Sequence, residues 1–346
     1  MRIGYSFWGF LGPGITDTPD GGRSHRRVLI EGLRSQGHDI VFLQPDRDHT
    51  EAGLDLSEHY QWDVGLPEID ALFLEWRWPI SGRNTTWCGA PGHTCDLHRQ
   101  QELLDHYTGR GTRTILWDKD RRLPADDPLR HQSNIAVCEA ALHPAPGAAS
   151  LLFPVADAIL DAADPAALAA RPREVPLAYV GNQYDRDTAF AEFFAPAAAR
   201  YRHVVAGKWT RTDAWPHVSF LGRVPFSEVA EIHHRALATV LLLPDRYAQV
   251  GQMTQRLVEA VLAGCMPLTP TSIRSAARFT PRRLHVTSGA DVIATLAWLH
   301  QTAGTSQHAE LIADCLRALD IFRVSRQLDV LDDLLAQPAG RGVAAS

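Results

Sequence analysis

The chain has 346 residues, enough for two domains of ordinary size, and its 45% hydrophobic and 21% charged residues are typical of a globular protein. No apolar run approaches the roughly 20 residues that span a bilayer, and the first residues have a strand pattern rather than a signal-peptide pattern, so we expect a cytoplasmic protein. Its net charge of −6 argues against a protein that binds duplex nucleic acid through a general basic surplus, although a local basic face remains compatible with it.

The N-terminal half alternates predicted strands with predicted helices. A strand over residues 2–8 is followed by a loop rich in Gly, Pro and Asp, and then by a helix over 23–36 that ends at Gly37. Further elements follow in chain order, namely strands over 38–43, 71–75 and 114–117 and a helix over 96–107. This alternation predicts an α/β domain with a mostly parallel sheet, to which we assign residues 1–160.

A second α/β series follows a connection rich in Pro and Ala between residues 144 and 176. Residues 175–320 are predicted to form a second Rossmann-like domain, and residues 321–346 a helix and tail that can cross back to the first domain. The predicted strands cover 177–181, 203–207, 218–222, 238–244 and 266–269, with helices over 187–201 and 226–235 and a further helix that carries Arg256.

Arg256 and Glu259 are the most informative pair in the sequence. Their spacing of three residues places them on one face of a helix that ends at Gly264. A guanidinium can hold a diphosphate, and a carboxylate can accept hydrogen bonds from a ribose diol. A solvated ion pair on an ordinary amphipathic helix is the alternative. The predicted strand before this helix places its start at the carboxyl end of a parallel sheet, where open α/β folds bind ligands.

Several motifs together carry a resemblance to known enzymes. The segments Gly21-Gly22-Arg23-Ser24-His25, Gly37-His38 before the second strand, Tyr179-Val180-Gly181-Asn182 and Gly222-Arg223-Val224-Pro225, with the Arg256/Glu259 helix, resemble bacterial glycosyltransferases in order and position. The resemblance implies the GT-B fold, in which two Rossmann-like domains with parallel sheets face each other across a cleft. It also implies a nucleotide-diphosphate sugar as co-substrate, for which we expect a UDP-sugar.

A narrower resemblance is to the phage DNA β-glucosyltransferases, which modify hydroxymethylated cytosine. Asp120-Arg121-Arg122-Leu123-Pro124 is similar to the motif that carries their catalytic Asp, and Gly222 to Pro225 is similar to a Gly-Lys-Ile-Pro turn. Arg256 and Glu259 match their phosphate-binding and ribose-binding residues. Most of the remaining sequence diverges, so the likeness supports the donor site better than the acceptor site.

The same comparison bears on stereochemistry. Many retaining enzymes of this fold have a second Glu eight residues from the one in the Arg/Glu helix, and here those positions are Gly251 and Pro267. This favours inversion, a single displacement that needs a general base. Asp120 is the first candidate and Asp118 its nearest rival, unless both belong to a solvated cluster with Lys119 and the following arginines. His25 is the third, since imidazole titrates near neutrality.

The remaining site predictions follow from position. For donor binding we expect Arg256, Glu259, Arg186, Gly181, Gly207, Gly222 and Val224, because all follow predicted strands of the second series or begin its helix. For acceptor binding we expect Gly21, Gly22, Trp76 and Arg77, although the last two can equally pack beneath the site. Arginines can take the place of a divalent cation at the diphosphate, so we expect no obligatory metal and no further cofactor.

Cys88, His93, Cys95 and His98 lie in a loop rich in Gly and Pro and could bind zinc. Structural zinc sites usually show tighter and more regular spacing, so the prediction is no metal. The five cysteines are otherwise isolated, which suits reduced thiols. The sequence thus predicts an inverting glycosyltransferase that acts on a small metabolite or natural product. The alternatives are a glucosyltransferase of hydroxymethylated DNA, a UDP-sugar epimerase, and a non-catalytic sugar-nucleotide-binding protein.

Overall fold

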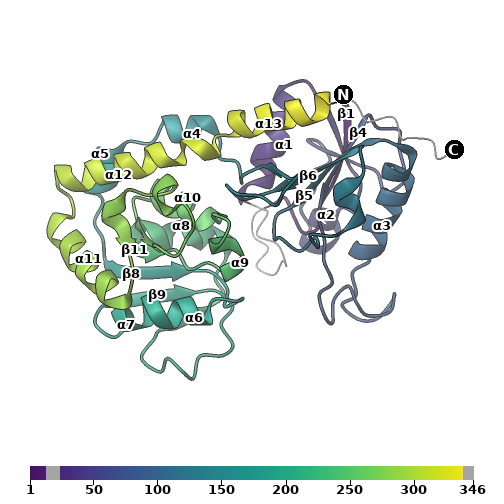
Figure 1. Ribbon diagram of the computed structural model, residues 1–346. Coiled ribbons are helices and arrows are strands. Elements are labelled where there is room, and N and C mark those ends of the chain that lie inside the picture. Colours follow the sequence, from purple (N-terminus) through teal and green to yellow (C-terminus); the bar gives the residue numbers. More distant parts are fainter. Residues whose placement is uncertain (13–23, 338–346) are drawn as a thin grey trace. The chain divides into compact units, whose positions relative to one another are not determined.

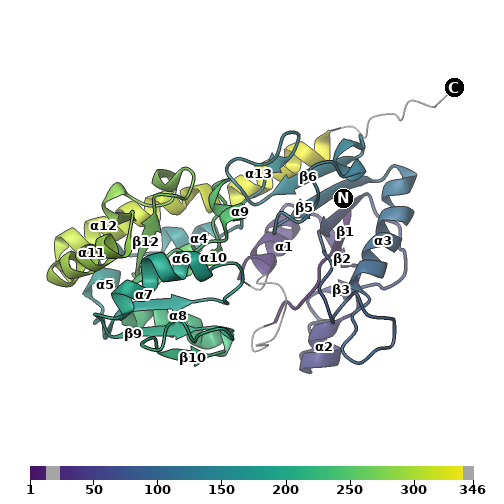
Figure 2. The same ribbon diagram turned by 60° about the horizontal axis from the view of Figure 1, so that its bottom comes forward.

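The computed structural model describes residues 1–12 and 24–337, and they form two compact units. The first unit comprises residues 1–12, 24–154 and 324–337, and the second comprises residues 155–323. Each unit has a parallel sheet with helices packed against it (Figures 1 and 2). The predicted α/β class with two parallel sheets is therefore confirmed. Gly21 and Gly22 lie outside the described residues.

The sheet of the first unit has the strand order β3-β2-β1-β4-β5-β6-β7. The chain first moves outward from β1 through β2 to β3 and then continues at β4 on the other side of β1. The carboxyl ends of β1 and β4 therefore form a topological switch point, where open α/β sheets bind ligands. The strands are β1 (Arg2–Ser6), β2 (Asp39–Phe42), β3 (Gln61–Trp62), β4 (Ala71–Glu75), β5 (Arg113–Asp118), β6 (Ile135–Glu139) and β7 (Ala149–Ser150).

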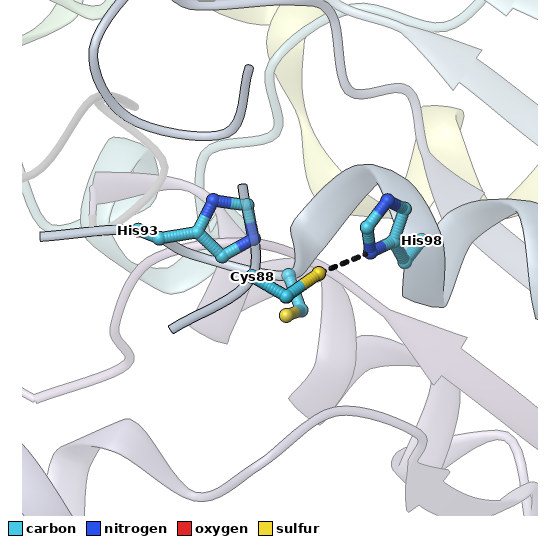
Figure 3. Close-up of side chains that lie close together, drawn as sticks. Cys88, His93 and His98 are labelled. Carbon is cyan, nitrogen blue, oxygen red and sulfur yellow. Dashed lines mark hydrogen bonds between the residues drawn. The ribbon is translucent and has the colours of Figure 1, made fainter. Parts of the chain in front are cut away.

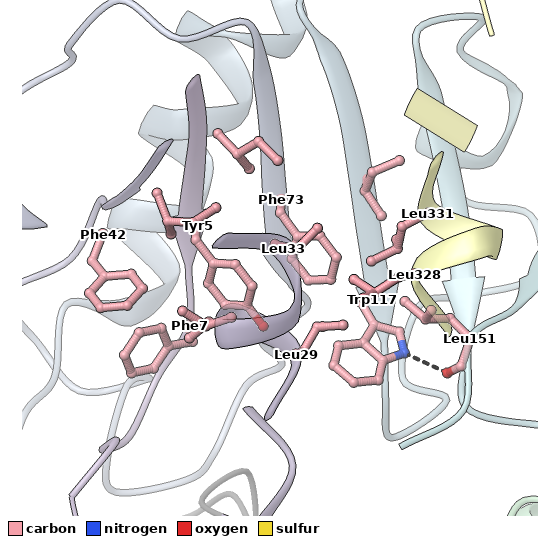
Figure 4. Packing of buried hydrophobic residues seen from close by; sticks show 14 of the residues in the cluster. Tyr5, Phe7, Leu29, Leu33, Phe42, Phe73, Trp117, Leu151, Leu328 and Leu331 are labelled. Carbon is pink, nitrogen blue, oxygen red and sulfur yellow. Dashed lines mark hydrogen bonds between the residues drawn. The ribbon is translucent and has the colours of Figure 1, made fainter. Parts of the chain in front are cut away.

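Alternating side chains of this sheet supply two separate cores. Tyr5, Phe73 and Trp117 point to the face covered by α1 (Arg26–Ser35) and α13 (Val324–Ala336), where leucines of both helices pack against them (Figure 4). Intervening residues of the same strands point to the other face, which α3 (Asp96–His106) covers. Trp117 is fully buried, and its indole N–H donates to the carbonyl of Leu151 over 3.0 Å. This two-sided burial explains the nearly continuous apolar runs of the strands.

The second sheet has the order β10-β9-β8-β11-β12-β13 and repeats the same switch, here between β8 and β11. The helix α8 (Phe226–Arg235) packs against both of these strands, and α10 (Gln255–Leu262) packs against α8 and β12. Gly264, with φ of +71°, ends the turn after α10. The strands are β8 (Val175–Val180), β9 (His203–Ala206), β10 (Phe220–Gly222), β11 (Ala236–Val240), β12 (Met266–Pro270) and β13 (His285–Val286).

The remaining helices of the described residues are mostly short. The longest are α11 (Gly289–Thr302) and α12 (Ser306–Ala318), and the others are α2 (Arg47–Ala52), α4 (Asp157–Asp161), α5 (Pro165–Ala170), α6 (Asp187–Ala189), α7 (Ala195–Ala198) and α9 (Asp245–Ala248). In residues 1–12 and 24–337, no helix combines the length and the apolar character that crossing a bilayer requires. The helix α13 returns to the first unit and packs against α1 and β5.

Several predicted elements differ from the structure. The helix predicted over residues 187–201 is interrupted between α6 and α7 by a π-helical segment, Phe190–Phe194, because Pro196 cannot donate a backbone hydrogen bond. The N-terminal helix begins at Arg26 rather than at residue 23. Strands β3, β6 and β13 were not predicted at all. The first and last of these are edge strands of two residues, too short to give a periodic pattern.

Candidate functional site

In the second unit, Arg256 lies at the switch point between β8 and β11. It is the second residue of α10, and its Nε donates a hydrogen bond to the carbonyl of Val180, the last residue of β8. The guanidinium carbon lies 5.3 Å from the centre of the Tyr179 ring. A Cβ atom at position 181 would lie 2.3 Å from Nη2 of Arg256. Gly181 is therefore required for the guanidinium to occupy this crevice.

Arg186 adds a second guanidinium close by. It is buried, and it ties the loop after β8 to the end of β11 by donating to the carbonyls of Tyr184 (2.7 Å) and Leu242 (3.1 Å). Burial lowers the pKa of Arg186, Tyr179 opposes that effect, and the positive charge of Arg256 lowers the pKa further. Two cations thus lie together at the carboxyl ends of β8 and β11. This arrangement of positive charge suits a diphosphate.

Glu259 lies one turn after Arg256 on α10 and is half-buried. Burial raises the pKa of this carboxyl group, and Arg256 only partly offsets the effect. Across the described ranges 1–12 and 24–337, the carboxylate accepts no hydrogen bond and forms no ion pair. A half-buried acceptor without a protein donor is suited to hold hydroxyl groups of a ligand.

Three further predicted donor residues lie at the neighbouring strand ends. Gly207 follows β9, and a Cβ atom there would lie 2.2 Å from the carbonyl oxygen of Gly181, so the two backbones touch. Its N–H donates to the carbonyl of Gly222 over 2.8 Å. Gly222 ends β10 with φ of +74°, and Val224 is half-buried in the loop that follows. The structure therefore brings the predicted donor residues of the second unit to one edge of its sheet.

Trp209 at this edge was missed by the sequence interpretation. Its indole N–H donates to the carbonyl of Gly181 over 2.8 Å, and its ring packs edge-on to Tyr179. The side chain of Asn182 also accepts from the backbone N–H of Lys208 over 2.8 Å, which joins the loops after β8 and β9. A Trp two residues after a Gly that ends a strand was the available signal.

In the first unit, Glu75 is the centre of a buried ionic network at the switch point between β1 and β4. Arg26 grips it with two hydrogen bonds, Nε to Oε1 at 2.8 Å and Nη2 to Oε2 at 2.7 Å. The Tyr5 hydroxyl donates to Oε1 at 2.8 Å, and Lys119 donates to Oε2. Burial alone would raise the pKa of Glu75, but Arg26 and Lys119 outweigh it and hold the pKa well below its usual range. Glu75 was not among the site residues predicted from the sequence.

His25 lies next to that network, immediately before α1. It is only 3% exposed, and its ring packs against Trp117 and Phe153. Neither ring nitrogen has a hydrogen-bond partner among the described residues. Burial lowers the pKa of His25 well below its usual value, and Lys119 lowers it further, so the imidazole is neutral at pH 7.

Asp118, the last residue of β5, and Asp120, two residues later, have different environments. Asp118 is fully buried, and its two oxygens accept the backbone N–H groups of Arg122 (2.9 Å) and Leu123 (2.8 Å). Burial raises the pKa of Asp118 to about 6. Asp120 is half-buried in the turn that follows. The alternative of a solvated cluster is wrong for Lys119, which is buried against Glu75.

The acceptor-binding prediction for Arg77 does not fit its environment. The residue is 1% exposed, and its guanidinium donates to the Ser6 hydroxyl (2.8 Å) and the Phe7 carbonyl (2.5 Å). Arg77 therefore joins the loop after β4 to the end of β1. This agrees with the alternative prediction that Arg77 packs beneath the site. Trp76 is half-buried and packs against the core under α3.

Proteins similar to this chain were found among solved structures but not by sequence comparison. No family model and no curated protein sequence matches the chain. Among solved structures, T4 phage β-glucosyltransferase in complex with UDP-glucose has a TM-score of 0.66 at 13% identity, over 97% of this chain and 100% of that one. An α-glucosyltransferase in complex with UDP-glucose and DNA has a TM-score of 0.64 at 10% identity, with the same coverage.

A glycosyltransferase of avilamycin A biosynthesis is similar as well, with a TM-score of 0.58 at 13% identity over 96% of each chain. The similarity extends over nearly the whole length of all three proteins, while the sequence identity is very low. The chain therefore has the GT-B fold of these glycosyltransferases.

Proposed function

We propose that this chain is an inverting glycosyltransferase that uses a nucleotide-diphosphate sugar, with UDP as the expected nucleotide. The observation that carries the proposal is the pairing of Arg256, fitted over Gly181, with Glu259 on the same helix, whose carboxylate has no partner in the described part of the chain. The guanidinium is placed for a diphosphate and the carboxylate for a ribose diol. The GT-B fold supports this assignment, since the similar structures include complexes with UDP-glucose.

In the proposed reaction, the acceptor hydroxyl loses its proton to a base of the first unit, and its oxygen attacks the anomeric carbon. The bond between that carbon and the diphosphate oxygen breaks in the same step, which inverts the configuration. Negative charge grows on the leaving diphosphate, where Arg256 and Arg186 stabilise it. Many retaining enzymes of this fold carry a second Glu eight residues before or after the one in the Arg/Glu helix, and Gly251 and Pro267 at these positions offer no carboxylate.

Asp120 is the base that we favour. Asp118 is fully buried, and both of its oxygens hold backbone N–H groups, so it serves to fix the loop. His25 is neutral, and its ring nitrogens have no partner within residues 1–12 and 24–337, but its 3% exposure limits contact with an acceptor. Asp120 is half-buried at the carboxyl end of β5, where a parallel sheet presents groups to ligands.

For the acceptor, we propose a hydroxylated small metabolite or natural product, which suits the net charge of −6. Hydroxymethylated DNA is the second candidate, because the DNA-modifying phage enzyme has a higher TM-score than the glycosyltransferase of avilamycin A biosynthesis. Incubation with radiolabelled UDP-glucose and either hydroxymethylcytosine DNA or a panel of hydroxylated metabolites separates these candidates. Donor alone is the third arm, in which an epimerised sugar would contradict a transferase.

Donor binding is tested by titration calorimetry with UDP. We expect Arg256→Ala and Glu259→Ala each to weaken binding about tenfold or more, which corresponds to at least about 1.4 kcal/mol. Arg235→Ala is the matched control, because this arginine pairs with Glu174 on the exposed surface of the same unit. Unchanged affinity in both site variants would refute the donor site.

The base is tested separately with Asp120→Asn. We expect this variant to bind UDP normally and to lose transfer by a factor of about 100 or more. Asp126→Asn, an exposed aspartate in the same loop, is the control and should remain active. Full transfer by Asp120→Asn would remove Asp120 from the mechanism, and an anomeric configuration retained in the product would remove the single displacement.

A further inference from the structure

Four metal-binding side chains meet in the loop between β4 and α3. Cys88, His93 and Cys95 belong to the loop, and His98 lies in the first turn of α3. Gly89 and Gly92, with φ of +88° and +77°, turn the chain between the first two of these residues. Their irregular spacing in the sequence argued against a zinc site, but the fold brings them together.

The ligand atoms of the four residues all lie within 4.8 Å of one another. Sγ of Cys88 lies 3.2 Å from Nδ1 of His98, and Figure 3 shows the rings of His93 and His98 on either side of that sulfur. A tetrahedral zinc ion, with bonds of about 2.3 Å to sulfur and about 2.0 Å to nitrogen, separates its ligand atoms by roughly 3.3 to 3.8 Å. Small side-chain rotations therefore suffice to close the set around an ion.

His93 is already held in the orientation that a metal ligand needs. Its Nδ1 lies 2.9 Å from the hydroxyl oxygen of Thr86, which itself donates to the carbonyl of Arg83 at 3.5 Å. In the tautomer that carries its proton on Nδ1, His93 donates to the Thr86 hydroxyl, and Nε2 keeps its lone pair for a metal ion. Nε2 of His93 is buried and has no hydrogen-bond partner among the residues that the structure describes. Such a second hydrogen bond commonly fixes the tautomer of a zinc-bound histidine.

We propose that Cys88, His93, Cys95 and His98 form a structural Zn²⁺ site. Two thiolates and two imidazoles are a donor set typical of zinc, whereas Mg²⁺ and Ca²⁺ prefer oxygen ligands. Four protein ligands complete a tetrahedral shell and leave no position for substrate, so this site is distinct from the proposed chemistry of sugar transfer.

The expected role of the ion is to fasten the loop to α3. Arg77 already contacts the same end of α3. Its Nη1 donates to the carbonyl of Asp96 over 3.3 Å, and its backbone N–H donates to the side-chain oxygen of Gln100 over 2.8 Å. Arg77 in turn contacts the end of β1 through Ser6. Zinc would therefore stabilise the carboxyl edge of the first sheet.

The test is the metal content of the full chain, expressed without a polyhistidine tag and purified without chelator. Mass spectrometry of the metals should find about one zinc per chain, and Cys95→Ser and His93→Gln should lose most of it. His131→Ala, an exposed histidine in the same unit, is the control and should retain zinc. Zinc retained in both ligand variants would overturn the site.

A second measurement covers variants that fail to fold. The wild-type protein, stripped of metal and titrated with Co²⁺, should develop the visible absorption of tetrahedral cobalt–thiolate at one equivalent, and the thiols of Cys88 and Cys95 should become protected from alkylation. Two sulfurs this close can also oxidise to a disulfide. A chain that carries a Cys88–Cys95 disulfide, or that binds neither Zn²⁺ nor Co²⁺ after reduction, would overturn the proposal.

Discussion

The guanidinium of Arg256 lies against the backbone of Gly181, so close that a Cβ atom at position 181 would lie 2.3 Å from Nη2. The glycine directly follows β8, and the arginine is the second residue of α10, the helix that precedes β12. This contact links two segments that are 75 residues apart, and it fixes where the positive charge of the proposed donor site lies.

Gly181→Ala should therefore displace Arg256 without removing its charge. We expect the affinity for UDP to fall about tenfold, similar to the effect expected for Arg256→Ala, because the guanidinium must leave the crevice. Titration calorimetry measures this. Gly304→Ala is the control, since Gly304 also has a positive φ but meets nothing within 4 Å, so it reports the backbone cost alone. Equal UDP affinity for Gly181→Ala and wild type would show that Arg256 does not bind the diphosphate.

Glu75→Gln should destabilise the first unit strongly. The substitution leaves the buried cations Arg26 and Lys119 without their counter-charge, which typically costs about 3 to 5 kcal/mol. Urea unfolding followed by circular dichroism measures the free energy of unfolding. Glu174→Gln, in an exposed pair with Arg235, should change it by less than about 1 kcal/mol. Similar losses in the two variants would contradict a buried network.

Much of the fold was predictable because its signals are local. The strand over Ala71–Glu75 and the helix over Phe226–Arg235 follow from apolar runs and helical periodicity between clear breaks, and both were predicted with the bounds that the structure shows. The edge strand β3 gives no such signal, because its two residues are a strand only through pairing with β2. The helix predicted over residues 187–201 is helical over 187–198 in the structure, but the sequence did not show the π-helical segment within it.

The candidate site was predictable only in part. Gly181 and Arg256 follow from the rule that ligands bind at strand ends, and the structure places them in contact. The pairing of Arg26 with Glu75 was not predictable, because the two residues are 49 positions apart and nothing in either segment marks the other. The Cys88 cluster shows the same difficulty, since regular spacing is a poor guide when glycine turns bring the ligands together.

Asp118 should make the stability of the protein depend on pH in a defined window. Its pKa is about 6 in the folded protein against an ordinary value of 3.8, so the folded state binds the proton more tightly than the unfolded state. The contribution of this group to stability is present below pH 4 and is lost as the pH rises through 6, by about 3 kcal/mol in total. The free energy of unfolding of wild type, relative to Asp118→Asn, should fall between pH 4.5 and 7.

Urea unfolding of both proteins at several pH values measures that difference, and Asp126→Asn is the control whose curve should run parallel to wild type. If the difference in the free energy of unfolding between wild type and Asp118→Asn stays constant across the window, burial does not raise the pKa of Asp118.

His25 should give the opposite slope. Burial and the nearby charge of Lys119 hold its pKa well below the ordinary 6.5, with Glu75 opposing and Arg26 adding to the effect, so the unfolded chain takes up the proton more readily. The stability that the neutral ring contributes is present above pH 6.5 and is lost as the pH falls. From pH 7.5 to 5.5, wild type should lose about 1 kcal/mol more than His25→Phe.

The measurement is again urea unfolding, at pH 5.5, 6.5 and 7.5, with His131→Phe as the exposed control that should follow wild type. The Phe ring keeps the contacts with Trp117 and Phe153 and removes only the titration, so a change in absolute stability does not affect the reading of the slope. If wild type and His25→Phe lose stability in parallel, the imidazole is not buried in its neutral form, and His25 would again compete with Asp120 for the role of base.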